Sequence, residues 1–150
     1  MAPNPFSRIV VAFDGSPDSI KAVKTACSMA KEYGADLKVI HVYSAPLFTY
    51  ATPAPTPQVD ARLLEESARQ AASKVLEEAK RLTKESGMEA RSELLEAGSV
   101  VQAIVEYAAN EKCDLIVVGT RGMTGFRKLI LGSVSSGIVS HAHCPVLVVR

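Results

Sequence analysis

A glycine-rich segment after a short apolar run carries the clearest chemical signal in this chain. The apolar run is Leu115–Val118, which is typical of a strand buried on both faces. Four glycines and a serine cluster follow it, namely Gly119, Gly122, Gly125, Gly132, Ser133, Ser135 and Ser136. Glycine lets a ligand approach the backbone closely, and the free N–H groups of a helix's first turn favour an anion. The segment therefore predicts a phosphate-binding loop between a strand and a helix.

The charges around this segment fit a bound anion. From Leu115 to Arg150 there is no Asp or Glu, while four basic residues occur there: Arg121, Arg127, Lys128 and Arg150. The whole chain is nearly neutral, with 17 Lys and Arg against 16 Asp and Glu. A nucleic-acid surface would require a basic face on the whole domain, so a small polyanion is the better prediction.

The spacing of these residues is specific. Gly119, Gly122, Gly132 and Ser133 read as G-x2-G-x9-G-S, which is neither a P-loop nor a dinucleotide-binding G-x-G-x-x-G. This pattern resembles the nucleotide-binding signature of the universal stress protein family, in the branch that binds ATP, and the resemblance covers essentially the whole chain. On the motif alone, a glycine loop without a ligand is the alternative.

The resemblance implies which residues contact a nucleotide. Asp14 would contact the ribose and phosphates or their metal, although a turn residue in the Asp-Gly-Ser bend is the alternative. Ala12 and Val42 would lie beside the adenine, and Gly98 would lie close to the nucleotide. The remaining implied site residues lie at the end of the apolar run Leu115–Val118 and after it: Val118, Gly119, Arg121, Gly122, Gly132, Ser133, Val134 and Ser135. Arg121 could pair with a phosphate, and no catalytic residue is assigned.

The elements that must position these residues alternate along the chain. Strands are expected at 8–13, 37–43, 88–95, 115–118 and 144–150, and helices at 17–33, 59–86, 100–110 and 133–142. Such an order predicts one α/β domain spanning residues 1–150, with helices on both faces of a parallel sheet. Right-handed crossovers favour the strand order 3-2-1-4-5, which brings Asp14 and Gly119 to one crevice. The resemblance implies the same order, in a fold like that of the adenine nucleotide alpha hydrolases.

Composition sets further bounds. The chain has 150 residues, no apolar run of the roughly 20 residues that span a bilayer, and no recognisable signal peptide, so a cytoplasmic protein is expected. Three cysteines, Cys27, Cys113 and Cys144, include no C-x-x-C pair, which favours buried thiols over a disulfide or zinc site. Four prolines in residues 46–57 exclude a helix there, leaving a lid or a mobile loop.

The function expected from the resemblance is that of an ATP-binding stress or regulatory protein with Mg²⁺ on the phosphates. AMP, cyclic AMP or another adenine nucleotide stays open as the ligand. The resemblance also implies a homodimer formed through the edge strand 144–150, unless the lead-in or the last helix shields that edge. A slow ATPase and a nucleotide-free dimeric interaction protein are the alternatives. Neither a nucleic acid nor a membrane is expected as a partner.

Overall fold

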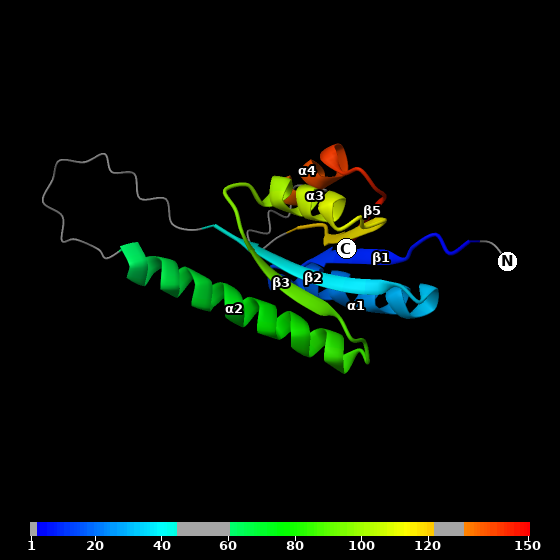
Figure 1. The fold of residues 1–150 in the computed structure, drawn as a ribbon, viewed down its shortest axis with the longest axis horizontal. Coiled ribbons are helices and arrows are strands. Elements are labelled where there is room, and N and C mark those ends of the chain that lie inside the picture. The colour runs from blue at the N-terminus through cyan, green and yellow to red at the C-terminus, as the bar shows by residue number, and fades with distance from the viewer. Residues whose placement is uncertain (1–2, 45–60, 122–130) are drawn as a thin grey trace, which may run out of the picture.

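The computed structural model describes residues 3–44, 61–121 and 131–150. They form a parallel sheet with the strand order β3-β2-β1-β4-β5, as the sequence predicted (Figure 1). The strands are β1 Arg8–Ala12, β2 Asp36–Tyr43, β3 Arg91–Glu96, β4 Leu115–Gly119 and β5 Val146–Val149. The helices are α1 Pro17–Tyr33, α2 Ala61–Glu85, α3 Val100–Asn110 and α4 Ser133–His141.

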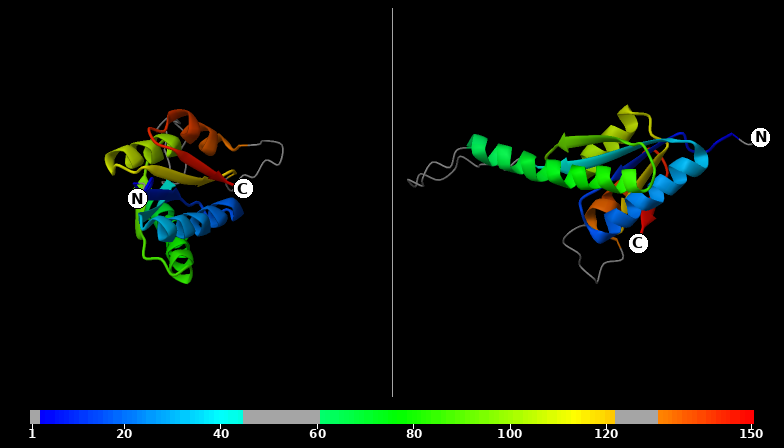
Figure 2. Two further views of the ribbon diagram at one scale, coloured as in Figure 1. Left: turned by 90° about the vertical axis from the view of Figure 1, so that its right-hand side faces the viewer. Right: turned by 90° about the horizontal axis from the view of Figure 1, so that it is seen from below.

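Helices cover both faces of the sheet. Helices α1 and α2 lie on one face, and α3 and α4 lie on the other (Figure 2). Successive residues of a strand point to opposite faces, so Val11 and Val117 enter the core beneath α1, while Val10 and Ile116 enter the core beneath α3 and α4. All residues of β4 are buried, which confirms the prediction of a strand buried on both faces.

The start of α1 is determined by local sequence. The hydroxyl of Ser16 accepts a hydrogen bond from Ser19 N at 3.2 Å, and Pro17 occupies the first helical position. The helix ends at Gly34, whose φ of 63° is left-handed. These signals place the N-terminus of α1 directly after β1, at the carboxyl edge of the sheet.

Two strands, β3 and β5, differ from their predicted bounds by two residues or more, and the other three differ by one residue. Strand β3 begins at Arg91 rather than at residue 88, because Met88 N bonds Thr83 O at 3.0 Å in the turn that ends α2. Strand β5 is confined to Val146–Val149, since Cys144 and Pro145 belong to the turn before it. The half-exposed pattern of β3 agrees with its predicted place at the edge.

The lead-in to β1 is bound at the amino edge of the sheet. The backbone N and hydroxyl of Ser7 each donate to Asp114 Oδ2 at 2.8 Å, and Arg8 N donates to Oδ1 at 3.0 Å. Burial by itself would raise the pKa of Asp114, but these hydrogen bonds outweigh it and lower that pKa. The contacts join the start of β1 to the start of β4.

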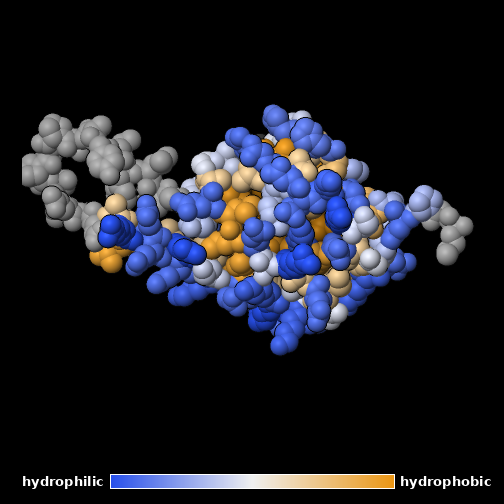
Figure 3. Space-filling model, viewed as in Figure 1, coloured by the Kyte–Doolittle hydropathy of each residue, from blue (hydrophilic) through white to orange (hydrophobic). Residues whose placement is uncertain are grey.

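The outer face of α2 is charged. Figure 3 shows mostly hydrophilic side chains along this helix, where Arg81 pairs with Glu78 and Glu85. Across residues 3–44, 61–121 and 131–150, no helix combines the length and apolarity that a membrane crossing requires.

The three cysteines are free thiols, two of them buried, and burial raises the pKa of Cys113 to about 11.

Candidate functional site

A cleft of about 200 Å³ opens at the carboxyl edge of the sheet, where β1 and β4 are neighbours and their chains continue into different helices. Ten of the residues predicted for the site line it: Ala12, Asp14, Val42, Val118, Gly119, Arg121, Gly132, Ser133, Val134 and Ser135. Gly122 lies outside the described residues. Gly98 lies beside a separate hollow between β3 and α3. The tertiary structure thus brings the two sequence-distant halves of the predicted site together.

Asp14 shapes the turn between β1 and α1. Its Oδ1 accepts a hydrogen bond from Ser16 N at 2.9 Å, and Gly15 between them has a φ of 85°. One carboxylate oxygen of Asp14 therefore has the turn-stabilising role that was the alternative from sequence. The other oxygen, Oδ2, makes no hydrogen bond within the described part of the chain. Asp14 can consequently hold its turn and still offer an oxygen to a ligand.

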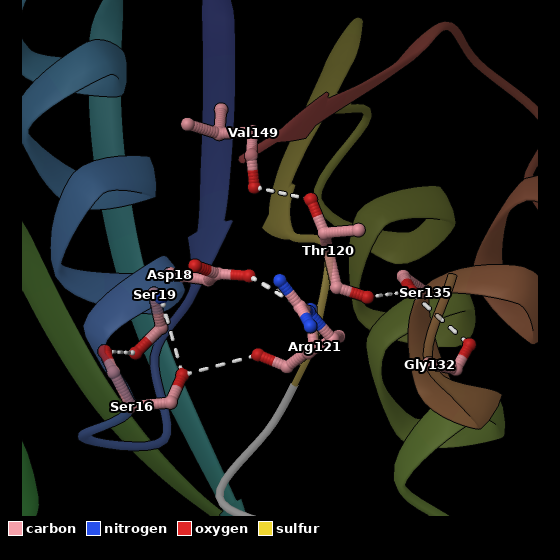
Figure 4. Close-up of polar contacts among 8 residues, drawn as sticks. All are labelled: Ser16, Asp18, Ser19, Thr120, Arg121, Gly132, Ser135 and Val149. Carbon is pink, nitrogen blue, oxygen red and sulfur yellow. Dashed lines mark hydrogen bonds and ion pairs between the residues drawn. The ribbon is translucent and has the colours of Figure 1, made fainter. Parts of the chain in front are cut away.

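Thr120 ties three elements together at the end of β4. Its backbone N and its hydroxyl both donate to Val149 O of β5 at 2.8 Å (Figure 4). Its carbonyl oxygen accepts from Gly132 N at 2.7 Å and from the Ser135 hydroxyl at 2.8 Å. The hydroxyl proton of Ser135 is therefore used to hold the backbone, not to contact a ligand.

The N-terminus of α4 faces the cleft without a capping side chain. Gly132 is its N-cap residue and offers no side-chain oxygen. In contrast, Ser16 and Ser99 cap α1 and α3. The first-turn N–H groups of α4, with the positive end of the helix dipole, are therefore available to an anion.

Gly119 is required by packing between β4 and α1. A Cβ atom at this position would lie 2.8 Å from the backbone carbon of Asp18 and 2.9 Å from Ser19 N. Real Cβ contacts are essentially never this short. The first glycine of the signature therefore lets the helix approach the strand, in addition to lining the cleft.

Arg121 is already paired. Its backbone N donates to Asp18 Oδ2 at 3.2 Å, and its Nε lies 3.9 Å from the same oxygen (Figure 4). The Ser16 hydroxyl donates to Arg121 O at 3.4 Å. Although no acidic residue follows Leu115 in the sequence, folding places a carboxylate of α1 beside the only basic residue in the described wall of the cleft.

The opposite wall of the cleft is apolar. It is formed by Ala12, Ile40, Val42, Val100, Ile104 and Val118. His41 also lines the cleft, and its Nδ1 donates to Phe13 O at 2.7 Å, because a carbonyl oxygen can only accept. His41 is thus engaged in holding the residue that follows β1 against β2. The cleft combines a surface for a flat apolar ring with a helix end for an anion.

Comparison with known proteins adds to this geometry. The sequence profile described as the Universal stress protein family matches residues 5–150. The chain belongs to the universal stress protein family. "Universal stress protein MJ0531" of Methanocaldococcus jannaschii is 38% identical over 147 residues, covering 98% of this chain and 84% of that protein.

Solved structures of other universal stress proteins share the fold. UspA from Lactobacillus plantarum has a TM-score of 0.79 and 26% identity, with 97% of this chain and 98% of that chain covered. A universal stress protein solved in complex with cAMP has a TM-score of 0.71 and 28% identity, with coverage of 97% and 98%. The family and the open α/β sheet predicted from sequence are both confirmed.

Several residues of this universal stress protein site were not predicted from its sequence. Val100 and Ile104 reach the cleft from α3, and Asp18 reaches Arg121 from α1. Their spacing marks them only as the apolar stripe and the acidic first turn of two helices. Thr120 could have been suspected, since it directly follows the strand inside the glycine motif.

Proposed function

We propose that this universal stress protein binds an adenine nucleotide, ATP with Mg²⁺, in the cleft between β1 and β4, and acts as a nucleotide-responsive regulatory homodimer. One observation carries the proposal. Asp14 and the described signature residues Gly119, Arg121 and 132–135, far apart in the sequence, line one cleft with an apolar wall at one side and an uncapped helix N-terminus at the other.

Each part of the nucleotide has a matching surface. The adenine would pack on the wall that includes Ala12 and Val42, with backbone groups reading its edge. The phosphates would accept hydrogen bonds from the first-turn N–H groups of α4, and the free Oδ2 of Asp14 would face the ribose or the metal. The solved relative in complex with cAMP supports an adenine nucleotide as the ligand class.

Mg²⁺ would accompany the phosphates. Among the described residues, no group of three or more His, Cys, Asp and Glu side chains could hold a metal ion. Mg²⁺ commonly retains several waters and binds through substrate phosphates plus one or two carboxylates, and Asp14 supplies a carboxylate of this kind. The residues therefore fit a metal that arrives with the nucleotide.

Binding as a signal fits the cleft better than rapid hydrolysis. Phosphoryl transfer to water requires a group that positions the water and a cation that stabilises the developing charge. In the described wall, Asp14 Oδ1 holds a turn, His41 Nδ1 holds a carbonyl and Arg121 is paired with Asp18. A slow ATPase is the second candidate, and turnover in the presence of Mg·ATP distinguishes it.

The test is the nucleotide content of the purified protein, followed by titration with Mg·ATP. Gly132→Asp would place a carboxylate at the N-cap of α4, where it would occupy the first-turn N–H groups and repel phosphate. We expect affinity to fall by about 30-fold or more, as for the loss of charge-assisted hydrogen bonds. Gly132→Asn caps without a charge and is the matched control, with a smaller loss.

Either of two results would refute this assignment. One is an empty wild-type protein that also fails to bind added adenine nucleotides. The other is a Gly132→Asp variant that binds Mg·ATP as tightly as the wild type. The first result would favour the nucleotide-free interaction protein, and the second would move the phosphates away from α4.

The homodimer would form through β5. This strand is at the edge of the sheet and consists of four half-buried apolar residues, Val146–Val149. The described bonds of the lead-in go elsewhere, to Tyr33, Asp36 and Asp114. Pairing of β5 with its two-fold mate would cover an apolar edge that otherwise invites association. The cytoplasmic location stays a prediction from sequence.

A further inference from the structure

We infer that Asp18 makes the cleft select metal-complexed ATP over metal-free ATP, an inference that rests on the proposed function. Asp18 is in the first turn of α1 and was not part of the predicted site. It acts through the negative charge that it places beside Arg121, so it is a specificity-determining residue that touches Arg121 and not the reacting atoms.

The position of Asp18 is held from two sides. Its side chain is only 16% exposed, and its Oδ2 accepts from Arg121 N at 3.2 Å. Its backbone lies so close to Gly119 that a Cβ atom there would come within 2.8 Å of it. The carboxylate is therefore fixed against the backbone that follows β4, beside Arg121, which lines the cleft (Figure 4).

The charge of Asp18 changes what this end of the cleft can bind. Arg121 is the basic residue of the described wall, and Asp18 pairs with its Nε at 3.9 Å. Asp14 adds a second carboxylate, so the carboxylates outnumber the guanidinium. The N-termini of α1 and α4 both border the cleft and contribute only about half a positive charge each. The described groups therefore leave a polyphosphate poorly neutralised.

A metal ion supplies the missing positive charge. Mg²⁺ bound to the phosphates cancels about half of the charge of ATP. It therefore weakens the electrostatic repulsion between the nucleotide and the carboxylates of Asp14 and Asp18. Metal-free ATP meets two carboxylates, Asp14 and Asp18, against the single guanidinium of Arg121 among the described groups. Among the described groups of the cleft the one guanidinium is already paired, so they favour the complexed nucleotide, and the size of that preference depends on Asp18.

The test is the dissociation constant of ATP measured in EDTA divided by the dissociation constant measured in Mg²⁺. Asp18→Asn keeps an oxygen that can accept from Arg121 N but removes the charge. We expect this variant to lower the ratio about fivefold, mainly by tighter binding of metal-free ATP, as for one unit charge acting through partly solvated protein. The change should shrink at high salt.

Three comparisons keep electrostatics separate from folding. Adenosine has no phosphate, so its affinity should be the same in the wild type and in Asp18→Asn. Arg121→Gln removes the paired cation and should shift the ratio in the opposite direction. Asp36→Asn removes an exposed carboxylate at the amino edge of the sheet, and should leave the ratio unchanged.

The outcomes are distinguishable. An unchanged ratio in Asp18→Asn, with ATP still bound, would overturn the inference while leaving the proposed function standing. Equal losses for adenosine and both forms of ATP would show a purely structural role and would also overturn it. A wild-type protein that binds neither ATP nor adenosine would refute the proposed function, and the inference with it.

Discussion

Replacing Gly119 by alanine should destabilise the fold because β4 and α1 pack in contact at this residue. The added Cβ would lie 2.8 Å from the Asp18 carbon and 2.9 Å from Ser19 N, whereas ordinary van der Waals contact begins at 3.4 Å. Both neighbours are backbone atoms, and β4 is buried on both faces, so no side chain can simply rotate away. The strand or the helix must shift by about half an ångström.

The expected cost follows from this overpacking. Forcing an extra methyl group into a well-packed site costs about 1–3 kcal/mol, although alanine also restricts the unfolded chain and recovers up to about 1 kcal/mol. For a domain of this size, the net loss corresponds to a melting temperature about 2–10 °C lower. Urea unfolding of the nucleotide-free protein, followed by circular dichroism, measures the free energy of unfolding directly.

Gly98→Ala is the matched control for this prediction. A Cβ at Gly98 would meet no atom within 4 Å, so the same substitution should leave stability unchanged or raise it slightly. A Gly119→Ala variant as stable as the wild type would refute the packing argument. If a Gly119→Ala variant were as stable as the wild type but failed to bind Mg·ATP, the glycine would be required for ligand binding and not for packing against α1.

Two further predictions concern the edges of the sheet. Asp114→Asn should cost about 1 kcal/mol at neutral pH, because hydrogen bonds from Ser7 and Arg8 lower the pKa of the carboxylate. A depressed pKa stabilises the fold fully above the unfolded value of about 3.9, so the difference from wild type should shrink as pH falls below that value and vanish once pH is below the lowered pKa of the folded state. Urea titrations at several pH values test this, and a constant difference would contradict it. Val148→Pro removes an N–H that should point away from β4, given that Thr120 N bonds Val149 O. This variant should stay folded and become monomeric in sedimentation, whereas Leu147→Pro should break the ladder to β4 and lower stability; a dimeric Val148→Pro would contradict the proposed interface.

Much of the fold could be predicted because its signals are local. Ser16, Pro17 and Gly34 mark the ends of α1 within a few residues of the groups that they cap. The apolar run of β4 identifies a strand buried on both faces. The bounds of β3 and β5 were less accurate, since turn residues such as Met88 are apolar for reasons of core packing and not of strand pairing.

The candidate site could be predicted in part, through the glycine spacing and the resemblance that it carried. Ten predicted residues line one cleft, and Gly98 lies apart from them because the turn before α3 faces the β3 side. Ser135 lines the cleft, but its hydroxyl donates its hydrogen bond to Thr120 O. The sequence shows that a hydroxyl is present, but it does not show which backbone oxygen that hydroxyl will meet.

By itself, the sequence determined the elements, their order and the family, because helix caps, apolar periodicity and motif spacing act over short stretches of chain. Only the tertiary structure decided the charge of the cleft, the pairing of Arg121 with Asp18 and the link from Thr120 to Val149. These contacts join residues far apart in sequence. They exist because parallel β1, β4 and β5 bring their carboxyl ends to one edge of the sheet, which is also where α1 and α4 begin.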